Sequence, residues 1–281
     1  MARFRPRKTF KLLAHLRGEI RGSLPVWKRE EWGLSPDLEH RCTTLHRHCA
    51  DQSSQLRLTR LVRRLTHHDF GVRESALAEL ELATRLIRTG ASVKFLPESQ
   101  SRTADLECHL DRERFFIEVT AMVGSAQRQR LPLRGLTIGK VWEDEEDRSV
   151  VLIHRILARI RQKATQLAAY SDPVVLSISI PRADLQGEET GQKNPVRLDL
   201  KILTGTVTVL LTELRHLSAV MISLWDVEPV PSKAGTRLAN VELIERARQQ
   251  QLYPRARMLV QNPAACKPLS ERQEEAVFRL L

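Results

Sequence analysis

Apolar residues recur at helical spacing between Glu74 and Gly90, and at the spacing of strands from there to Val123. Placed at intervals of about 100°, the apolar side chains of the first part share one face of a helix. These side chains are Ala76, Leu80, Ala83, Leu86 and Ile87. Gly90 ends the pattern and VKFLP follows it. The segment therefore predicts a helix, a short strand and a two-stranded hairpin.

Glu79 departs from this pattern because it lies within the apolar stripe, whereas Glu74 and Glu81 fall on the opposite face. A carboxylate that faces a core costs several kcal/mol unless a cation or a metal ion pairs with it. Two interpretations follow. Glu79 either lies at the edge of the stripe and reaches water or an arginine, or it belongs to a site that holds a positive ion.

Two strand-like runs, Leu106 to Leu110 and Arg114 to Thr120, are joined by a polar turn at residues 111–113. Side chains alternate along a strand, so Glu118 and Thr120 point to the same side. Asp105 begins the first run and can lie close enough to Glu118 to share an ion. Carboxylate oxygens suit Mg²⁺ or Mn²⁺. The alternative is a surface turn in which Asp105 only caps a strand.

The order of these features resembles the PD-(D/E)XK, or restriction-endonuclease-like, nuclease superfamily. The similar features are Glu79 in a helix, then VKFLP, TADLE and FIEVT. The resemblance covers roughly residues 72–268 and is strongest at 76–120. It implies an α/β fold with a mixed central sheet flanked by helices. It also implies that Glu79 matches the helical Glu of the family, Asp105 the motif Asp and Glu118 the second metal ligand.

The sequence departs from the family motif at two positions. Ala104 stands where the motif has a proline, which is a minor change. Thr120 stands where the motif has a lysine, which supplies positive charge near the attacking water and the phosphate. A threonine hydroxyl cannot replace that charge. Either a basic residue comes from elsewhere in the chain, or the protein binds nucleic acid without cutting it.

A long helix is predicted from about Ser149 to Ala169 by its apolar periodicity. Lys163 lies closest to the apolar stripe, and KATQ resembles the K-x-x-Q that many members of the superfamily carry on this helix. The resemblance therefore makes Lys163 the candidate for the displaced cation near Asp105 and Glu118, and Gln166 a further candidate site residue. Alternatively, the stem of Lys163 packs on the stripe while its amine reaches water.

The remaining segments complete a mixed α/β pattern. Residues 173–181, 218–226 and 256–263 predict strands, whereas 206–214 and 241–251 predict helices. We expect a basic, mainly helical N-terminal extension (1–70), a nuclease-like domain (71–268) and a C-terminal tail (269–281).

Charge favours a polyanion as partner, because the net charge is +11 and the pI is near 10.0. Residues 1–70 hold fifteen Lys and Arg against seven Asp and Glu. A predicted amphipathic helix at 54–65 and a polar loop at 124–135 supply candidate phosphate-binding residues. These are Arg57, Arg60, Arg63, Arg64, Arg128 and Arg130. The alternative is that the helix at 54–65 is a solvated docking helix that does not contact phosphate.

Four cysteines without paired spacing indicate a reducing compartment, and we expect a cytoplasmic protein. No apolar run has the length of a membrane span. The Arg-rich, acid-poor opening is typical of a basic arm and also of an organellar transit peptide. Cys42, His46 and Cys49 would align along one side of a helix and so are candidate zinc ligands. Structural zinc sites normally take two ligands from a second element, and no CxxC follows.

Three functions are consistent with these patterns. The first is a metal-dependent nuclease that uses Mg²⁺ or Mn²⁺ held by Asp105 and Glu118, with Glu79 and Lys163 assisting, and DNA as the expected substrate. The second is a nucleic-acid-binding protein of the same fold without catalysis. The third is a regulatory interaction protein in which Glu79 pairs with an arginine. A single site cuts one strand, so duplex cleavage implies a homodimer or two successive events.

Overall fold

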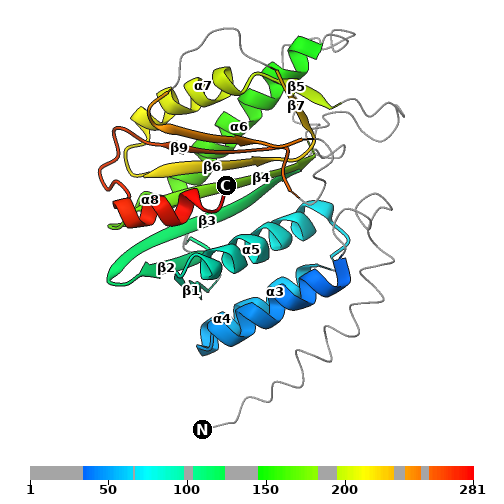
Figure 1. Ribbon diagram of the computed structural model, residues 1–281, viewed down its shortest axis with the longest axis vertical. Coiled ribbons are helices and arrows are strands. Elements are labelled where there is room, and N and C mark those ends of the chain that lie inside the picture. Colours follow the sequence, from blue (N-terminus) through cyan, green and yellow to red (C-terminus); the bar gives the residue numbers. More distant parts are fainter. Residues whose placement is uncertain are drawn as a thin grey trace.

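A seven-stranded mixed sheet lies between two layers of helices in the computed structural model of the protein (Figure 1). The structure describes residues 34–65, 67–97, 104–123, 145–182, 195–230, 238–247 and 253–281. The predicted mixed α/β architecture is therefore confirmed. No helix in these ranges combines the length and apolar character that crossing a bilayer requires.

The sheet has the strand order β1-β2-β3-β4-β6-β9-β8. Its strands are β1 (Ser92–Phe95), β2 (Leu106–Leu110), β3 (Glu113–Val123), β4 (Val174–Arg182), β6 (Ala219–Leu224), β8 (Val241–Glu245) and β9 (Ala256–Gln261). Pairing is antiparallel from β1 to β3, parallel from β3 through β4 to β6, and antiparallel from β6 through β9 to β8. Two further strands, β5 (Val196–Leu198) and β7 (Val227–Pro229), form a separate parallel pair.

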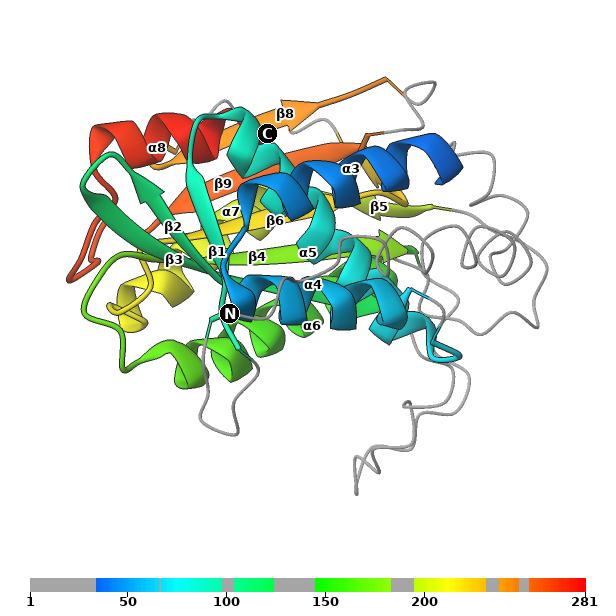
Figure 2. The same cartoon turned by 90° about the horizontal axis from the view of Figure 1, so that it is seen from below.

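Helices cover both faces of the sheet (Figure 2). The first core contains residues from α3 (Leu34–His48), α4 (Gln52–Arg64), α5 (Phe70–Arg88) and α8 (Glu271–Phe278). The second core contains residues from α6 (Glu145–Leu167) and α7 (Leu200–Glu213). Because both faces are covered, the central strands are almost continuously apolar.

The central helix α5 is defined at both ends by local chemistry. The Asp69 side chain accepts hydrogen bonds from the N–H groups of Gly71 and Val72, which is a helix N-cap. At the other end Gly90 adopts a φ of 91°, a conformation that glycine takes without steric cost. The chain can then reverse directly into β1, as the glycine in the sequence suggests.

Strand β3 connects the two cores. Phe115, Ile117 and Val119 enter the first core, under α5, whereas Phe116 enters the second, under α6. By this alternation Glu118 belongs to the face covered by α6. The sequence FFIEV is therefore apolar on both sides of the strand, and its one carboxylate lies against a helix.

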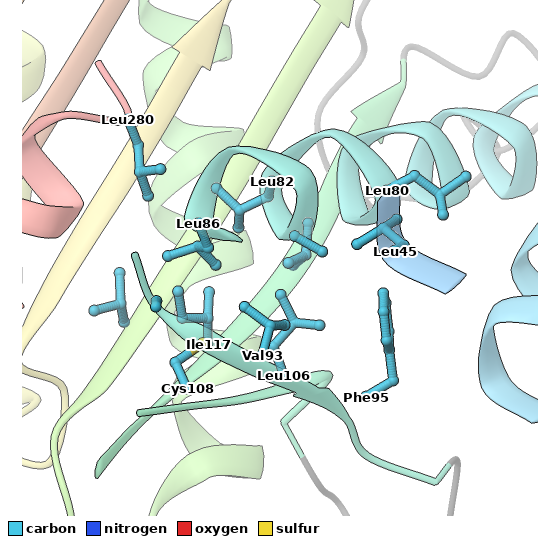
Figure 3. Packing of buried hydrophobic residues seen from close by; sticks show 14 of the residues in the cluster. Leu45, Leu80, Leu82, Leu86, Val93, Phe95, Leu106, Cys108, Ile117 and Leu280 are labelled. Atoms are coloured by element: carbon cyan, nitrogen blue, oxygen red, sulfur yellow. The ribbon is translucent and has the colours of Figure 1, made fainter. Parts of the chain in front are cut away.

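Residues 34–65 contain two helices, α3 and α4, that pack on the rest of the described chain. Leu45 of α3 and Leu58 and Leu61 of α4 are buried in the same core as α5 and β1. Figure 3 shows Leu45 beside Leu80 and Phe95. The boundary expected at residue 70 thus falls inside one continuous core. The rest of the predicted extension, residues 1–33, lies outside the described residues.

The C-terminal segment is also part of the core, although the sequence suggested a tail at 269–281. Ser270 caps α8 through a capping box with Gln273. Leu269, Val277, Leu280 and Leu281 are buried in the first core. Short length concealed this, because one eight-residue helix has a weak periodic signal.

The helix predicted at 241–251 is wrong, because Val241–Glu245 is the edge strand β8. It pairs with β9 in an antiparallel register that places Leu243 opposite Met258. Glu, Leu and Arg favour helices in isolation, but pairing with a strand that is distant in sequence overrides that preference. The prediction at 206–214 was correct in type, and α7 begins earlier because Asp199 caps it.

The zinc candidates face the interior of the protein. Cys42 and Cys49 are both buried in the first core, and the Cys49 thiol donates a hydrogen bond to the Val93 carbonyl at 3.1 Å. Burial raises the pKa of Cys49 to about 12. A thiol so held behaves as a small apolar side chain, since the thiolate is the form that binds zinc.

Leu280→Ala should lower the free energy of unfolding by about 2–5 kcal/mol, because it removes a buried side chain from a core shared with α5. Phe278→Ala is the matched control, since Phe278 is exposed on the same segment. Urea unfolding followed by circular dichroism measures both. Equal, small losses for the two variants would mean that the segment is a dispensable tail.

Candidate active site

Strand β3 continues beyond the start of β2, where Leu106 pairs with Ile117. We call the point where the two strands part the fork, and Asp105, the residue before β2, lies there. Its backbone N–H donates to the Ile117 carbonyl at 3.1 Å, and its carbonyl accepts from the Leu96 N–H at 2.9 Å. Its side-chain Oδ2 accepts from the Val119 N–H at 2.9 Å. The carboxylate thus replaces the strand that β3 loses at this point. A buried N–H would otherwise lack an acceptor, so the fold fixes the position of this side chain.

Glu118 and Lys163 meet on the α6 side of the fork. Glu118 is buried, and its Oε1 accepts from Lys163 Nζ at 2.5 Å. Lys163 comes from the flank of α6 that faces β3. The structure thus brings together Lys163 and Glu118, two of the candidate residues. An amine on α6 can reach this point because parallel β3 and β4 require a crossover helix over that face.

Glu79 lies on the opposite side of the sheet and is paired with Arg57. Arg57 Nε lies 3.3 Å from Glu79 Oε1, and Arg57 Nη2 lies 3.1 Å from Glu79 Oε2. The same Nη2 lies 2.9 Å from Asp105 Oδ1. The guanidinium therefore bridges two carboxylates from α5 and the fork. This is the arginine pairing that the sequence left open for Glu79.

Arg57 is not a surface phosphate contact, which corrects the role expected from the sequence. Its side chain is 4% exposed, as buried as the Glu79 side chain at 5%. The sequence shows four arginines on one helix but not which of them faces inward. Arg60 and Arg63 are exposed and Arg64 is half-buried. Arg128 and Arg130 lie outside the described residues.

Burial dominates the electrostatics of the carboxylates. It raises the pKa of Glu79 well above the usual range, Asp105 raises it further, and Arg57 opposes both. Burial, then the charge of Asp105, raises the pKa of Glu118 to about 7, with Lys163 opposing. A hydrogen bond with Asp105 adds to that rise. The cluster thus holds more negative charge than burial tolerates without cations.

Tyr170 joins the two strands that carry the carboxylates. Its hydroxyl accepts a hydrogen bond from the Ala104 N–H at 2.6 Å. Its ring packs on Phe116, with 4.4 Å between ring centroids. Burial, followed by the nearby charges of Glu118 and Asp105, raises the Tyr170 pKa. Sequence reasoning missed this residue, because a tyrosine three positions beyond the end of α6 has no periodic signal.

Two other candidates lie next to the cluster. Thr120 is buried two residues after Glu118, on the same face of β3. Gln166 is half-buried one turn after Lys163. Arg64 also lies near the carboxylate cluster. Burial and the charge of Arg57 lower its pKa, and the charges of Glu79 and Asp105 oppose that change.

Among the residues that the structure describes, no group of three or more His, Cys, Asp and Glu side chains is arranged to hold a metal ion. Arg57 and Lys163 bind the carboxylate oxygens instead. Comparisons with models of protein families, with curated proteins and with solved structures find no match to this chain.

Glu118→Gln should remove a pH dependence of stability. The folded state holds a proton on Glu118 up to a pKa of about 7, whereas the unfolded state releases it near 4.5. The free energy of unfolding should therefore fall as pH rises between these values, by at most about 1.4 kcal/mol per pH unit. Urea titrations from pH 4 to 8 measure it. Glu213→Gln, at an exposed site, should behave like the wild type; a Glu118→Gln curve parallel to it would contradict the assignment.

Arg57→Met should cost about 3–5 kcal/mol of stability, because it leaves Glu79 buried without its cation. Arg57→Met combined with Glu79→Leu should recover most of that loss, since an apolar pair can replace a buried ion pair. Arg272→Met is the control, because the Arg272–Asp111 pair is exposed. Chemical unfolding of the four proteins decides. A loss of stability in Arg57→Met as small as that in the control would contradict a stabilising role for the Arg57 bridge between Glu79 and Asp105.

Proposed function

We propose that the protein is a metal-dependent nuclease with a restriction-endonuclease-like core, which hydrolyses phosphodiester bonds of DNA. One observation carries the proposal. Asp105, Glu118 and Lys163, from the start of β2, from β3 and from α6, converge at the fork of the sheet. Two acids and an amine meeting in a partly buried place is what the family resemblance requires for its catalytic centre.

The order of elements supports the same proposal. A helix, α5, precedes three antiparallel strands, and the helix α6 then crosses to a parallel strand, β4. Asp105 begins one strand and Glu118 lies in the next. This is the arrangement that the superfamily resemblance implies: a helix, then a mixed sheet with an acid on each of two adjacent strands.

The donor set suits Mg²⁺ or Mn²⁺ at Asp105 and Glu118. Both side chains offer oxygen ligands, and they lie within hydrogen-bonding reach of one another. Two carboxylates held this close share either a proton or a cation. The chemistry that such an ion supplies when bound is polarisation of the phosphate and a lower pKa for the attacking water. Glu79 is the less suitable ligand, because Arg57 binds both of its oxygens.

Lys163 has the role of the missing motif lysine in this proposal. Its side chain is 20% exposed and its amine contacts Glu118, so the side chain reaches from the surface to the buried carboxylate. From that position it can stabilise negative charge that develops on a phosphate. Thr120 carries no charge and keeps its hydroxyl on the same face. Tyr170 positions the backbone at Ala104, and with it Asp105.

A non-catalytic nucleic-acid-binding protein is the second candidate, and Arg57 favours it. The guanidinium already pairs with Glu79 and Asp105, so part of the negative charge of the site is offset without a metal ion. Such a protein would retain the basic surface and lack the chemistry. A homodimer is proposed only if both strands of a duplex prove to be cut together.

Asp105→Asn should lower cleavage of DNA at least about a hundredfold, because it removes a proposed metal ligand and its charge. Purified full-length protein is incubated with duplex and single-stranded DNA and RNA, in Mg²⁺, Mn²⁺ or EDTA. Asp172→Asn is the matched control, since Asp172 pairs with Arg114 at the surface. Binding of DNA is measured in parallel by anisotropy.

Lys163→Met should lower cleavage by a similar factor, whereas Lys201→Met on the exposed side of α7 should not. Metal-dependent cleavage that survives in Asp105→Asn would overturn this assignment of the site. Salt-sensitive DNA binding by a wild type that cuts nothing in any metal would instead establish the second candidate.

A further inference from the structure

Helix α6 carries a one-sided charge. After Asp147 it contains six basic residues and no acidic residue. The basic residues are Arg148, His154, Arg155, Arg159, Arg161 and Lys163. A helix at the surface usually mixes both signs, because alternate charges stabilise it through pairs at i and i+4. Five turns whose charged side chains are all positive cannot form such opposite-charge pairs within the helix.

Three of these residues form a row that leads to the candidate active site. Arg155, Arg159 and Lys163 follow one another at intervals of four, and each is half-buried. On an α-helix they lie within about 80° of one another and about 6 Å apart along the axis. The row occupies the flank between the apolar face and solvent. Lys163, at its end, binds Glu118.

The row concentrates like charge where burial already disfavours it. Burial lowers the pKa of Arg155, and the neighbouring charge of Arg159 lowers it further. Among the described residues no carboxylate offsets this at Arg155. Arg159 donates a hydrogen bond to the Gln162 amide at 3.1 Å, which orients its guanidinium. An anion with several charges, spread along the same direction, would stabilise positive charges held this close to one another.

We propose that Arg155, Arg159 and Lys163 form a track for several backbone phosphates of one nucleic-acid strand, leading that strand to Asp105 and Glu118. The proposal rests on the proposed function for the identity of the ligand. Three cations spread over about 12 Å span several phosphates of a strand that carries one every ~3.4 Å of duplex axis. A single small anion would contact only one of the three. Guanidinium groups bind phosphate through two parallel hydrogen bonds, which suits arginine at two of the positions.

The test measures DNA binding in EDTA, so that it does not depend on cleavage. Labelled duplex and single-stranded DNA, and the matching RNA, are titrated by anisotropy at several salt concentrations. Arg155→Gln and Arg159→Gln should each weaken binding about five- to tenfold near 0.1 M salt. Each should also reduce the slope of log K against log salt by about 0.9 for duplex, or about 0.7 for a single strand. The double variant should show both losses.

Arg161→Gln is the matched control, because Arg161 is exposed on the other side of the same helix. It changes the net charge equally and should leave the slope unchanged. Arg155→Lys keeps the charge and should retain the wild-type slope, which separates a phosphate contact from a packing role. Thermal melts confirm that each variant is folded.

Several outcomes would overturn the track. The first two are a loss of DNA affinity in Arg161→Gln equal to that in Arg155→Gln, and an unchanged salt slope in the double variant. The other two concern the wild type: no binding of any nucleic acid, or tighter binding to vesicles containing phosphatidylserine than to DNA. Failure of the nuclease proposal is distinct from these. A wild type that cuts nothing, but loses salt-dependent binding with Arg155 and Arg159, retains the track and lacks the chemistry. If the double variant binds DNA normally and still cuts it, the nuclease proposal stands and the track proposal is wrong.

Discussion

The structure depends on neutralising carboxylates that the fold buries at one place. Glu79 comes from α5, Asp105 from the residue before β2 and Glu118 from β3, and the three meet at the fork between β2 and β3. Buried negative charge of this density is not tolerated without cations. Arg57 supplies one from α4 on one face of the sheet, and Lys163 supplies the other from α6 on the opposite face. The sheet is thus joined to both helical layers through the same few charges.

This constraint explains why α4 belongs to the core rather than to an accessory segment. Arg57 can reach Glu79 and Asp105 only if α4 packs closely on α5 and β1, and its leucines are buried there. The helix therefore has two sides with different tasks. Its inward side completes the carboxylate cluster, and its outward side presents Arg60 and Arg63. Position in the fold, not residue type, separates a buried arginine from an exposed one.

The same charges set the conditions for chemistry. In the state described here both cations bind the carboxylates, and a divalent ion would compete with them for oxygen ligands. Lys163 is the more accessible of the two, so in the proposed nuclease it can exchange between Glu118 and a phosphate. The basic row on α6 ends at this lysine, and under the same proposal it gives an incoming strand a series of positive charges. The proposed binding and the proposed catalysis would then be linked through one amine.

The sequence by itself determined the mixed α/β class, most of the strands and the central helix, because their apolar periodicity is strong and local. It also singled out Glu79 and Glu118, since polar residues in apolar patterns are rare, whereas Asp105 was chosen for its place at the start of a strand and Lys163 for the K-x-x-Q resemblance. Only the tertiary structure decided their partners. Arg57 lies 22 residues from Glu79 and 48 from Asp105, and no local pattern encodes such pairs. The strand at 241–245 and the core role of α8 were hidden for the same physical reason: their stability comes from segments distant in sequence.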